Sequence, residues 1–234
     1  MSEGADGLYL PKLLQRQREF HNGLVIRSDF KLCGETTGGD VWLSSLALAT
    51  LLSYLGICGP GVRVIELGAG TGYLGLVLAL SGAKVLLTDV PDQIGLLESN
   101  VESNIAHLER AGGSVRVASL DWGMAPSDDV ITKTFDVVVG SECLYEDEHV
   151  EQILKTVKTL MDKCSAKCFY YAMQLDRMGS DRYFSELTSL ASAQPYDLRV
   201  QHLRPSSVFH DGPCAISPEC LRRNALNFVM FEKK

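Results

Sequence analysis

The sequence lacks a run of about 18 uninterrupted apolar residues, the shortest length that predicts a helix across a bilayer. Its first residues mix acids and glycines before any apolar stretch, which is not the pattern of a secretory signal peptide. Internal repeats and low-complexity tracts are also missing. These absences predict a globular protein without a membrane partner, and we expect it in the cytoplasm, with the nucleus as a second location.

Clusters of lysine and arginine are missing as well. The 22 basic residues are outnumbered by 29 acidic ones, which gives a net charge of −7. Proteins that follow a phosphate backbone concentrate positive charge on one face, although a local basic patch could still form in three dimensions. The composition argues against nucleic acid as the main partner and suits a neutral, basic or protein substrate.

The seven cysteines include no Cys-x-x-Cys pair, and no histidine pair at zinc spacing accompanies them. An odd number of cysteines without such spacing predicts reduced, mostly buried thiols and no metal site. Cys214 and Cys220 could form a metal or redox pair, but nothing near them supports that alternative.

The order of the apolar segments predicts the fold. Short strand-like runs alternate with helical periodicity, which indicates a doubly wound α/β fold, in which helices cover both faces of a mostly parallel, seven-stranded sheet. We expect the last strands to pair antiparallel at one edge. We predict a single domain spanning 1–234, with a lead-in at 1–40 and a core at 41–234. Within the lead-in, 24–27 and 30–32 can form a hairpin. The expected strands of the sheet are 63–67, 84–88, 115–118, 135–140, 168–173, 196–203 and 227–231.

One glycine-rich segment lies between an expected strand and an expected helix. Gly68, Gly70 and Gly72 follow a Gly-x-Gly-x-Gly spacing, and Glu66 stands two residues before the first glycine. Dinucleotide sites use Gly-x-Gly-x-x-Gly instead, so that a pyrophosphate sits at the helix N-terminus. A carboxylate at Glu66 would repel a pyrophosphate but suits a cofactor that carries an ammonium and a sulfonium. The spacing therefore favours S-adenosylmethionine (AdoMet) over NAD.

Two further acidic residues follow neighbouring strands. Asp89 ends the next strand, where an acid hydrogen-bonds the ribose hydroxyls of a nucleoside cofactor. Asp121 follows the third strand and is a candidate acceptor for the adenine amino group, with Trp122 packing on the ring. Both have simpler alternatives: Asp89 can be a helix N-terminal acid, and Asp121-Trp122 a turn with a core tryptophan.

Four separated motifs occur in a recognisable order. Glu66–Gly72, Leu87–Asp89, Asp121–Gly123 and Val139–Tyr145, preceded by Thr37–Trp42, resemble the seven-β-strand, Rossmann-like methyltransferases of the family-16 type. Most members of this family are protein-lysine methyltransferases. The resemblance spans roughly residues 20 to 175.

This resemblance implies an AdoMet-dependent N-methyltransferase that acts on a lysine of a protein substrate, of the chaperone or translation factor type, as a monomer. It also assigns the cofactor contacts. The methionine and ribose portions would contact Glu66, Gly68, Gly70 and Asp89, the adenine would contact Asp121 and Trp122, and Trp42 and Ser141 would complete the cofactor site.

The resemblance makes Glu142 and Tyr145 the expected catalytic pair. Glu142 would anchor the incoming amine, and Tyr145 would line its channel and attract it through cation–π contact. The family signature here is Asp-x-x-Tyr, so this chain carries one extra methylene. A displacement of about 1 Å can cost about 100-fold in rate. Two alternatives therefore stay open. The target can be another nitrogen, in a histidine or a small molecule, or the protein can be a silent AdoMet-binding scaffold. A third alternative, an NAD-dependent oxidoreductase, is the weakest because of the glycine spacing.

Two further expectations concern positions outside these motifs. His149 carries no motif and is interpreted as a surface residue. The long connection at 201–224 can form one wall of the substrate site, because loops at strand ends carry specificity, or it can be a solvated loop.

Overall fold

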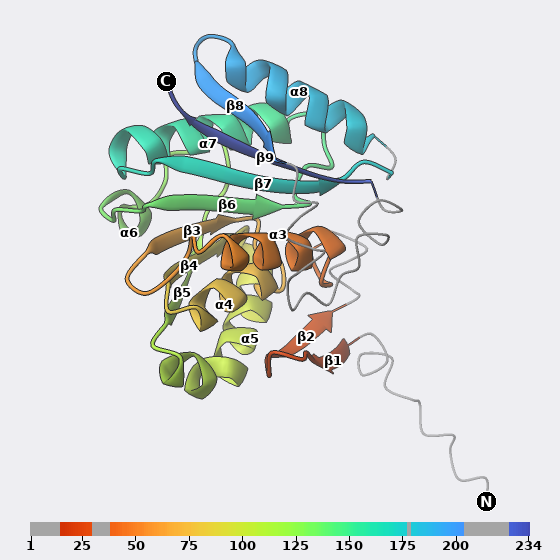
Figure 1. The fold of residues 1–234 in the computed structure, drawn as a ribbon, viewed down its shortest axis with the longest axis vertical. Helices are drawn as coiled ribbons and strands as arrows, with labels where there is room; N and C mark the ends of the chain where they lie inside the picture. The colour runs from red at the N-terminus through yellow and green to blue at the C-terminus, as the bar shows by residue number, and fades with distance from the viewer. Residues whose placement is uncertain (1–14, 30–37, 177–178, 204–224) are drawn as a thin grey trace, which may run out of the picture.

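A seven-stranded sheet forms the centre of the protein (Figure 1). The computed structural model describes residues 15–29, 38–176, 179–203 and 225–234. Cys214, Cys220 and most of the 201–224 connection lie outside the described residues. The strands of this sheet are β3 (Arg63–Leu67), β4 (Lys84–Asp89), β5 (Ser114–Ser119), β6 (Val137–Ser141), β7 (Cys168–Gln174), β8 (Leu198–Leu203) and β9 (Leu226–Lys233).

The spatial order of the strands is β5-β4-β3-β6-β7-β9-β8. All neighbours from β5 to β7 pair in parallel, and β9 pairs antiparallel with both β7 and β8. The predicted doubly wound, mostly parallel sheet is therefore confirmed. The antiparallel strand β9 lies inside the sheet, between β7 and β8, so that β8 forms the edge.

Helices cover both faces of the sheet, as Figure 1 shows. Helices α3, α4 and α5 pack on one face, and α7 and α8 pack on the other, where the short α6 also lies. No helix within the described ranges is long and apolar enough to cross a membrane. The helices are α3 (Leu43–Tyr54), α4 (Tyr73–Leu80), α5 (Pro91–Arg110), α6 (Asp128–Ile131), α7 (His149–Lys163) and α8 (Ser180–Ser192).

The strands are apolar at consecutive positions because both faces of the sheet are buried. In β6, for example, Val137 and Val139 pack against the α3–α5 layer, whereas Val138 packs against the α7–α8 layer. Successive side chains of a strand point to opposite faces, so this alternation follows from strand geometry alone. It leaves the polar residues at the strand ends, where the site described below is found.

The N-terminal strands form a separate two-stranded hairpin. Strand β2 (Val25–Asp29) pairs antiparallel with β1 (Gln15–Glu19). The predicted strand at 24–27 is present, but its partner precedes it in the chain, whereas the expected partner at 30–32 lies outside the described residues. Strand β1 reads QRQRE and has no apolar alternation, so its sequence carried no strand signal.

Two buried asparagines of α5 hold the hairpin against the core. Asn104 accepts the Val25 N–H at 2.9 Å and donates to the Val25 carbonyl at 2.8 Å. One turn earlier, Asn100 accepts the Arg27 N–H at 2.8 Å and donates to the Arg27 carbonyl at 3.0 Å. These side chains replace a third strand for β2. Asn100 also donates to the Thr71 carbonyl at 2.9 Å, which ties the glycine-rich loop to the same helix.

Replacing Asn100 by alanine should lower the free energy of unfolding by about 2–3 kcal/mol. The substitution leaves the buried Thr71 carbonyl without this partner, which costs about 1–3 kcal/mol, whereas the part-buried N–H and carbonyl of Arg27 can turn to water at a smaller cost. Urea denaturation measures the change. The matched variant Asn104→Ala should destabilise the hairpin without releasing the Thr71 carbonyl. Unchanged unfolding midpoints in both variants would show that the hairpin contributes nothing to stability.

Candidate active site

A cavity opens where the carboxyl ends of β3, β4, β5 and β6 meet. In doubly wound sheets, ligands bind at this edge, near the point where the strand order reverses, and here that point lies between β3 and β6. The enclosed volume is about 90 Å³, less than the ~300 Å³ of a typical complete ligand site. A nucleoside cofactor would therefore also cover the open surface of the loop. The cavity is lined by Gly38, Trp42, Gly68, Asp89, Val90, Leu120, Asp121, Trp122, Glu142, Cys143, Tyr145, His149 and Gln152.

The glycine-rich loop after β3 borders the cavity through Gly68. Gly68 and Gly70 have φ angles of 64° and 56°, a region that favours glycine. A Cβ at Gly68 would lie 2.8 Å from the Cys143 Cβ, and one at Gly70 would lie 2.9 Å from the Gly38 carbonyl oxygen. Glycine is thus required at both positions, by the backbone turn and by the closeness of neighbouring segments.

Asp89 fixes the position of this loop. Its Oδ2 accepts the Gly70 N–H at 2.7 Å, and its Oδ1 accepts the Val90 N–H at 2.8 Å. Burial raises the pKa of this carboxyl group, and the two backbone N–H donors oppose the rise. Each carboxylate oxygen keeps a free lone pair, so Asp89 can still accept hydroxyl groups from a ligand.

Glu66 has a different environment from the expected one. It is buried and does not line the cavity. Its Oε2 accepts the Gly75 N–H at 2.8 Å, in the first turn of α4, where helix N–H groups have no helical partner. Burial raises the pKa of Glu66 to about 8, and the nearby Asp89 adds to the rise. The geometry assigns Glu66 to capping α4 beneath the loop, so its expected direct contact with a cofactor remains a prediction.

Three rings form one wall of the cavity. The His149 ring meets Trp122 edge-on at a centroid distance of 5.6 Å and Tyr145 edge-on at 4.6 Å. The prediction that His149 is a surface residue is wrong, because the ring is largely buried and lines the cavity. Burial lowers the pKa of His149, which favours the neutral ring. Its Nδ1 has no hydrogen-bond partner among the described residues.

Glu142 follows β6 directly and lines the cavity across from the glycine-rich loop. Its φ of 54° is rare for a residue with a side chain, and such strained positions cluster at functional sites. The side chain is buried, and its Oε2 accepts the Gln174 N–H at the end of β7 at 3.0 Å. The longer carboxylate of this chain is therefore held in a fixed place. Helix α7 starts only at His149, so neither Glu142 nor Tyr145 lies in a helix.

The structure brings most of the predicted site residues together. The cavity includes seven of them, Trp42, Gly68, Asp89, Asp121, Trp122, Glu142 and Tyr145. Gly70, Glu66 and Ser141 are buried and do not line the cavity. The sequence reading missed Val90, Leu120, Cys143, His149 and Gln152. His149 stands four residues after Tyr145, a spacing that could have indicated a shared face, but α7 begins only at His149.

The family model for lysine methyltransferases matches residues 21–190, which is most of the chain. The chain belongs to this family. The match contains the glycine-rich loop, Asp89, the Asp121-Trp122 pair and the segment from Glu142 to Tyr145, so every element of the cavity described above belongs to the matched region.

Individual relatives agree with the lysine methyltransferase family. The chain is 30% identical over 188 residues to protein N-lysine methyltransferase METTL21A of Danio rerio, covering 79% of this chain and 83% of the relative. It is 33% identical over 120 residues to EEF1A lysine methyltransferase 3 of Mus musculus, covering 51% of this chain and 49% of the relative. The match thus spans about half the length of that mouse protein.

Solved structures share the fold of this lysine methyltransferase. A TehB-like SAM-dependent methyltransferase from Corynebacterium glutamicum superposes with a TM-score of 0.51 at 15% identity, covering 87% of this chain and 93% of that chain. At this identity the likeness supports the architecture of the sheet and its helices.

The buried Glu66 predicts a pH dependence of stability. Its pKa rises on folding from an ordinary value of 4.5 to about 8, so the folded protein binds this proton more tightly than the unfolded chain does. The stabilisation is full below the lower value and is lost as the pH rises toward the higher one, by at most about 1.4 kcal/mol per pH unit.

Glu66→Gln should remove this dependence, because the amide oxygen still accepts the Gly75 N–H and carries no charge. Urea denaturation of the ligand-free protein between about pH 5 and pH 8 should show the variant gaining at least about 1 kcal/mol relative to the native chain. Parallel stability profiles of the two proteins would mean that Glu66 does not hold its proton over this range.

Proposed function

We propose that this lysine methyltransferase transfers the methyl group of AdoMet to the side-chain amine of a lysine in a protein substrate. The observation that carries the proposal is a single cavity in which the glycine-rich loop and Asp89 face Glu142 and an aromatic wall. A nucleoside cofactor and an incoming amine would thus meet at one edge of the sheet. The proposed substrate class is a chaperone or translation factor. The name of the mouse relative gives EEF1A as the substrate of that protein.

The residues of the loop fit a cofactor of this kind. Gly68 has no side chain, so a cofactor can approach its backbone closely. A Cβ at this position would lie 3.0 Å from Trp122 Cζ2 and would crowd the expected adenine site. Asp89 would accept the ribose hydroxyls, and Asp121 and Trp122 would hold the adenine. Trp42, which precedes α3 and lines the cavity, would close the methionine end. When bound, AdoMet supplies an electrophilic methyl group on a sulfonium.

Glu142 would bind the incoming amine. A lysine enters as an ammonium, and a buried carboxylate attracts that charge and accepts its hydrogen bonds. The Gln174 N–H fixes one oxygen of Glu142, so the carboxylate can orient the amine at the position where reaction requires it. The amine must also lose a proton before it can act as a nucleophile, and Glu142 would receive that proton directly or through water.

The aromatic wall would favour the neutral amine. Desolvation of an ammonium lowers its pKa, and the rings of Trp122, His149 and Tyr145 offer few hydrogen bonds to compensate. The neutral His149 ring adds no positive charge that would repel the substrate. The exposed Glu146 and Glu148 beside this wall would attract a basic peptide to the opening.

A second candidate is methyl transfer to another nitrogen, in a histidine or a small molecule. Glu142 in place of the family aspartate favours this alternative, because it changes where the carboxylate meets the acceptor. A silent AdoMet-binding scaffold is the third outcome of the experiment below. We also propose that the protein is a monomer, which light scattering after gel filtration would test. Its proposed location is the cytoplasm or the nucleus, which cell fractionation would test.

Methylation of cell-extract proteins with methyl-labelled AdoMet should depend on the carboxylates of Glu142 and Asp89. Glu142→Gln keeps the size of the side chain and an acceptor for Gln174, but it cannot take a proton. We expect the rate to fall by about 10²–10⁴-fold, the usual loss for an acid–base group, with unchanged cofactor affinity. Asp89→Ala should instead weaken S-adenosylhomocysteine binding by about 10–100-fold, because charge-assisted hydrogen bonds are lost.

The control is Glu186→Ala, an exposed glutamate of α8 away from the cavity, which should leave both properties unchanged. Mass spectrometry of the labelled band identifies the target residue. Label confined to small molecules or to histidine would overturn the lysine assignment. Cofactor binding without any label would favour the scaffold.

A further inference from the structure

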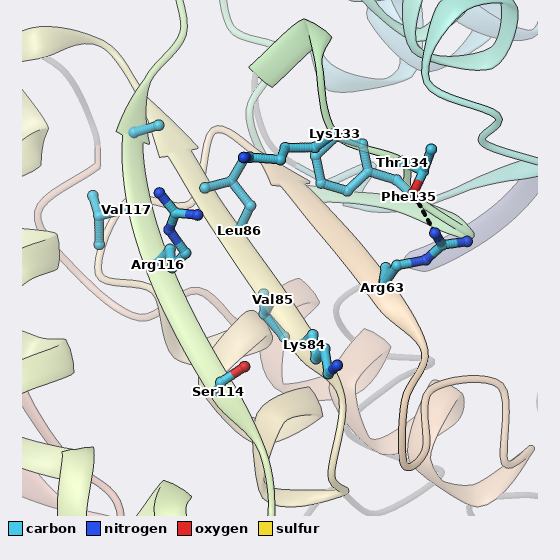
Figure 2. Close-up of a pocket in the computed structure, with 11 residues that line it drawn as sticks. Arg63, Lys84, Val85, Leu86, Ser114, Arg116, Val117, Lys133, Thr134 and Phe135 are labelled. Carbon is cyan, nitrogen blue, oxygen red and sulfur yellow. Dashed lines mark hydrogen bonds between the residues drawn. The ribbon is translucent and has the colours of Figure 1, made fainter. Parts of the chain in front are cut away.

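A second and larger cavity lies at the opposite end of the strands, toward the amino ends of β3, β4 and β5. Its volume is about 320 Å³, within the ~300–1,000 Å³ range of binding sites. Figure 2 shows this cavity over the face of the sheet that carries Leu86 and Arg116. Helices α7 and α8 pack on this face farther along the sheet, and Figure 2 shows Lys133, Thr134 and Phe135 beside the strands of the cavity. None of the residues that line this cavity belongs to a helix, and Leu86 and Ala118 on this face are only partly buried.

Positive charge surrounds this cavity, which we name the β5 groove; it is lined by Arg63, Lys84, Val85, Leu86, Ser114, Arg116, Val117, Ala118, Lys133, Thr134 and Phe135. Parallel pairing places Arg116 beside Leu86 and Ser114 beside Lys84. In Figure 2 the Lys133 side chain extends toward Leu86 from the connection above the sheet. Basic residues spread from position 63 to position 133 of the sequence thus form a basic patch on a protein of net charge −7.

Three of the four cations in the groove lack a carboxylate partner in the described part of the chain. Arg63 is the exception, because its Nε and one terminal nitrogen bind Asp136 at 2.9 and 2.7 Å. This bidentate pair lowers the pKa of Asp136 to about 2. Among the residues that the structure describes, no acidic group forms an ion pair with Lys84, Arg116 or Lys133. The charge of these three side chains is therefore available to a ligand.

The floor between the cations is apolar. Leu86 and Ala118 are only partly buried on this face, and Phe135 closes the cavity from above. Strand β5 is also the last strand of the sheet, and no segment within the described ranges pairs with its outer edge. An extended peptide can align with such an edge and place alternate side chains on one face.

We propose that the β5 groove binds an extended acidic segment of a protein partner, with carboxylates on Arg116 and Lys133 and an apolar side chain over Leu86. Charge complementarity selects an acidic partner. The apolar floor and the open strand edge select a polypeptide over a small anion, which would leave both unused. The groove lies at the opposite end of the strands from the active-site cavity, so this binding does not depend on the proposed methyl transfer.

Fluorescence anisotropy of the whole protein with a labelled peptide of alternating glutamate and leucine tests the proposal. We expect saturable binding that weakens with added salt, because salt screens exposed charges. Arg116→Glu and Lys133→Glu should each weaken binding at least tenfold, about 1.4 kcal/mol. The matched charge reversal is Lys163→Glu, because Lys163 is an exposed lysine at the end of α7. This variant should change the peptide affinity less than twofold. Saturating S-adenosylhomocysteine should not displace the peptide.

Several results would overturn the proposal. Equal weakening by Lys163→Glu would show a general charge effect, and displacement by inorganic phosphate at equal charge concentration would show a small-anion site. If the reversal at Arg116 causes aggregation, the residue protects the strand edge, as charges on edge strands commonly do. Arg116→Gln then decides, because it removes the charge but keeps a polar side chain at the edge. Unaltered peptide affinity in that variant would exclude the groove as the binding site.

Discussion

The hydrogen bond from the Gly70 N–H to the Asp89 carboxylate is the contact on which the shape of the candidate active site depends. It joins the loop after β3 to the end of β4, and so it sets where the backbone of the loop faces the cavity. The loop can take this path only because Gly68 and Gly70 adopt positive φ angles. Asp89 therefore shapes the loop, and its remaining lone pairs can still accept hydrogen bonds from a ligand, as the proposed cofactor role requires.

Other groups support the loop from the side away from the cavity. Glu66 caps the first turn of α4 immediately after the loop, and Asn100 binds the Thr71 carbonyl within it. Because Asn100 also binds β2, the hairpin and the loop share one anchoring residue. A protein that must bind and release a cofactor gains from this arrangement, because a loop held at several points loses little conformational entropy on binding.

The sequence predicted the features that depend on local pattern. The strands of the sheet are continuous apolar runs, and the glycine spacing and Asp89 lie within one strand–helix–strand unit, so their relation is visible from residue spacing. Strand β1 was missed because its stability comes from pairing with β2, which two asparagines about eighty residues away hold in place. His149 was misread because its burial results from Trp122 and Tyr145, which come from different connections. The hydrogen bond from the Gly75 N–H to Glu66 was likewise not predicted, because it depends on how α4 packs beside β3.

The same limit explains the β5 groove. In the sequence, Lys84, Arg116 and Lys133 are scattered, and their spacing argues against a basic surface. Register brings them together, because parallel pairing aligns β4 with β5 and the connection before β6 crosses back over the sheet. The acids Glu146 and Glu148 lie at the carboxyl end of the strands, while these cations lie toward the amino ends. These two acids and three cations therefore lie at opposite ends of the strands, so a basic segment and an acidic segment would be drawn to different ends of the sheet.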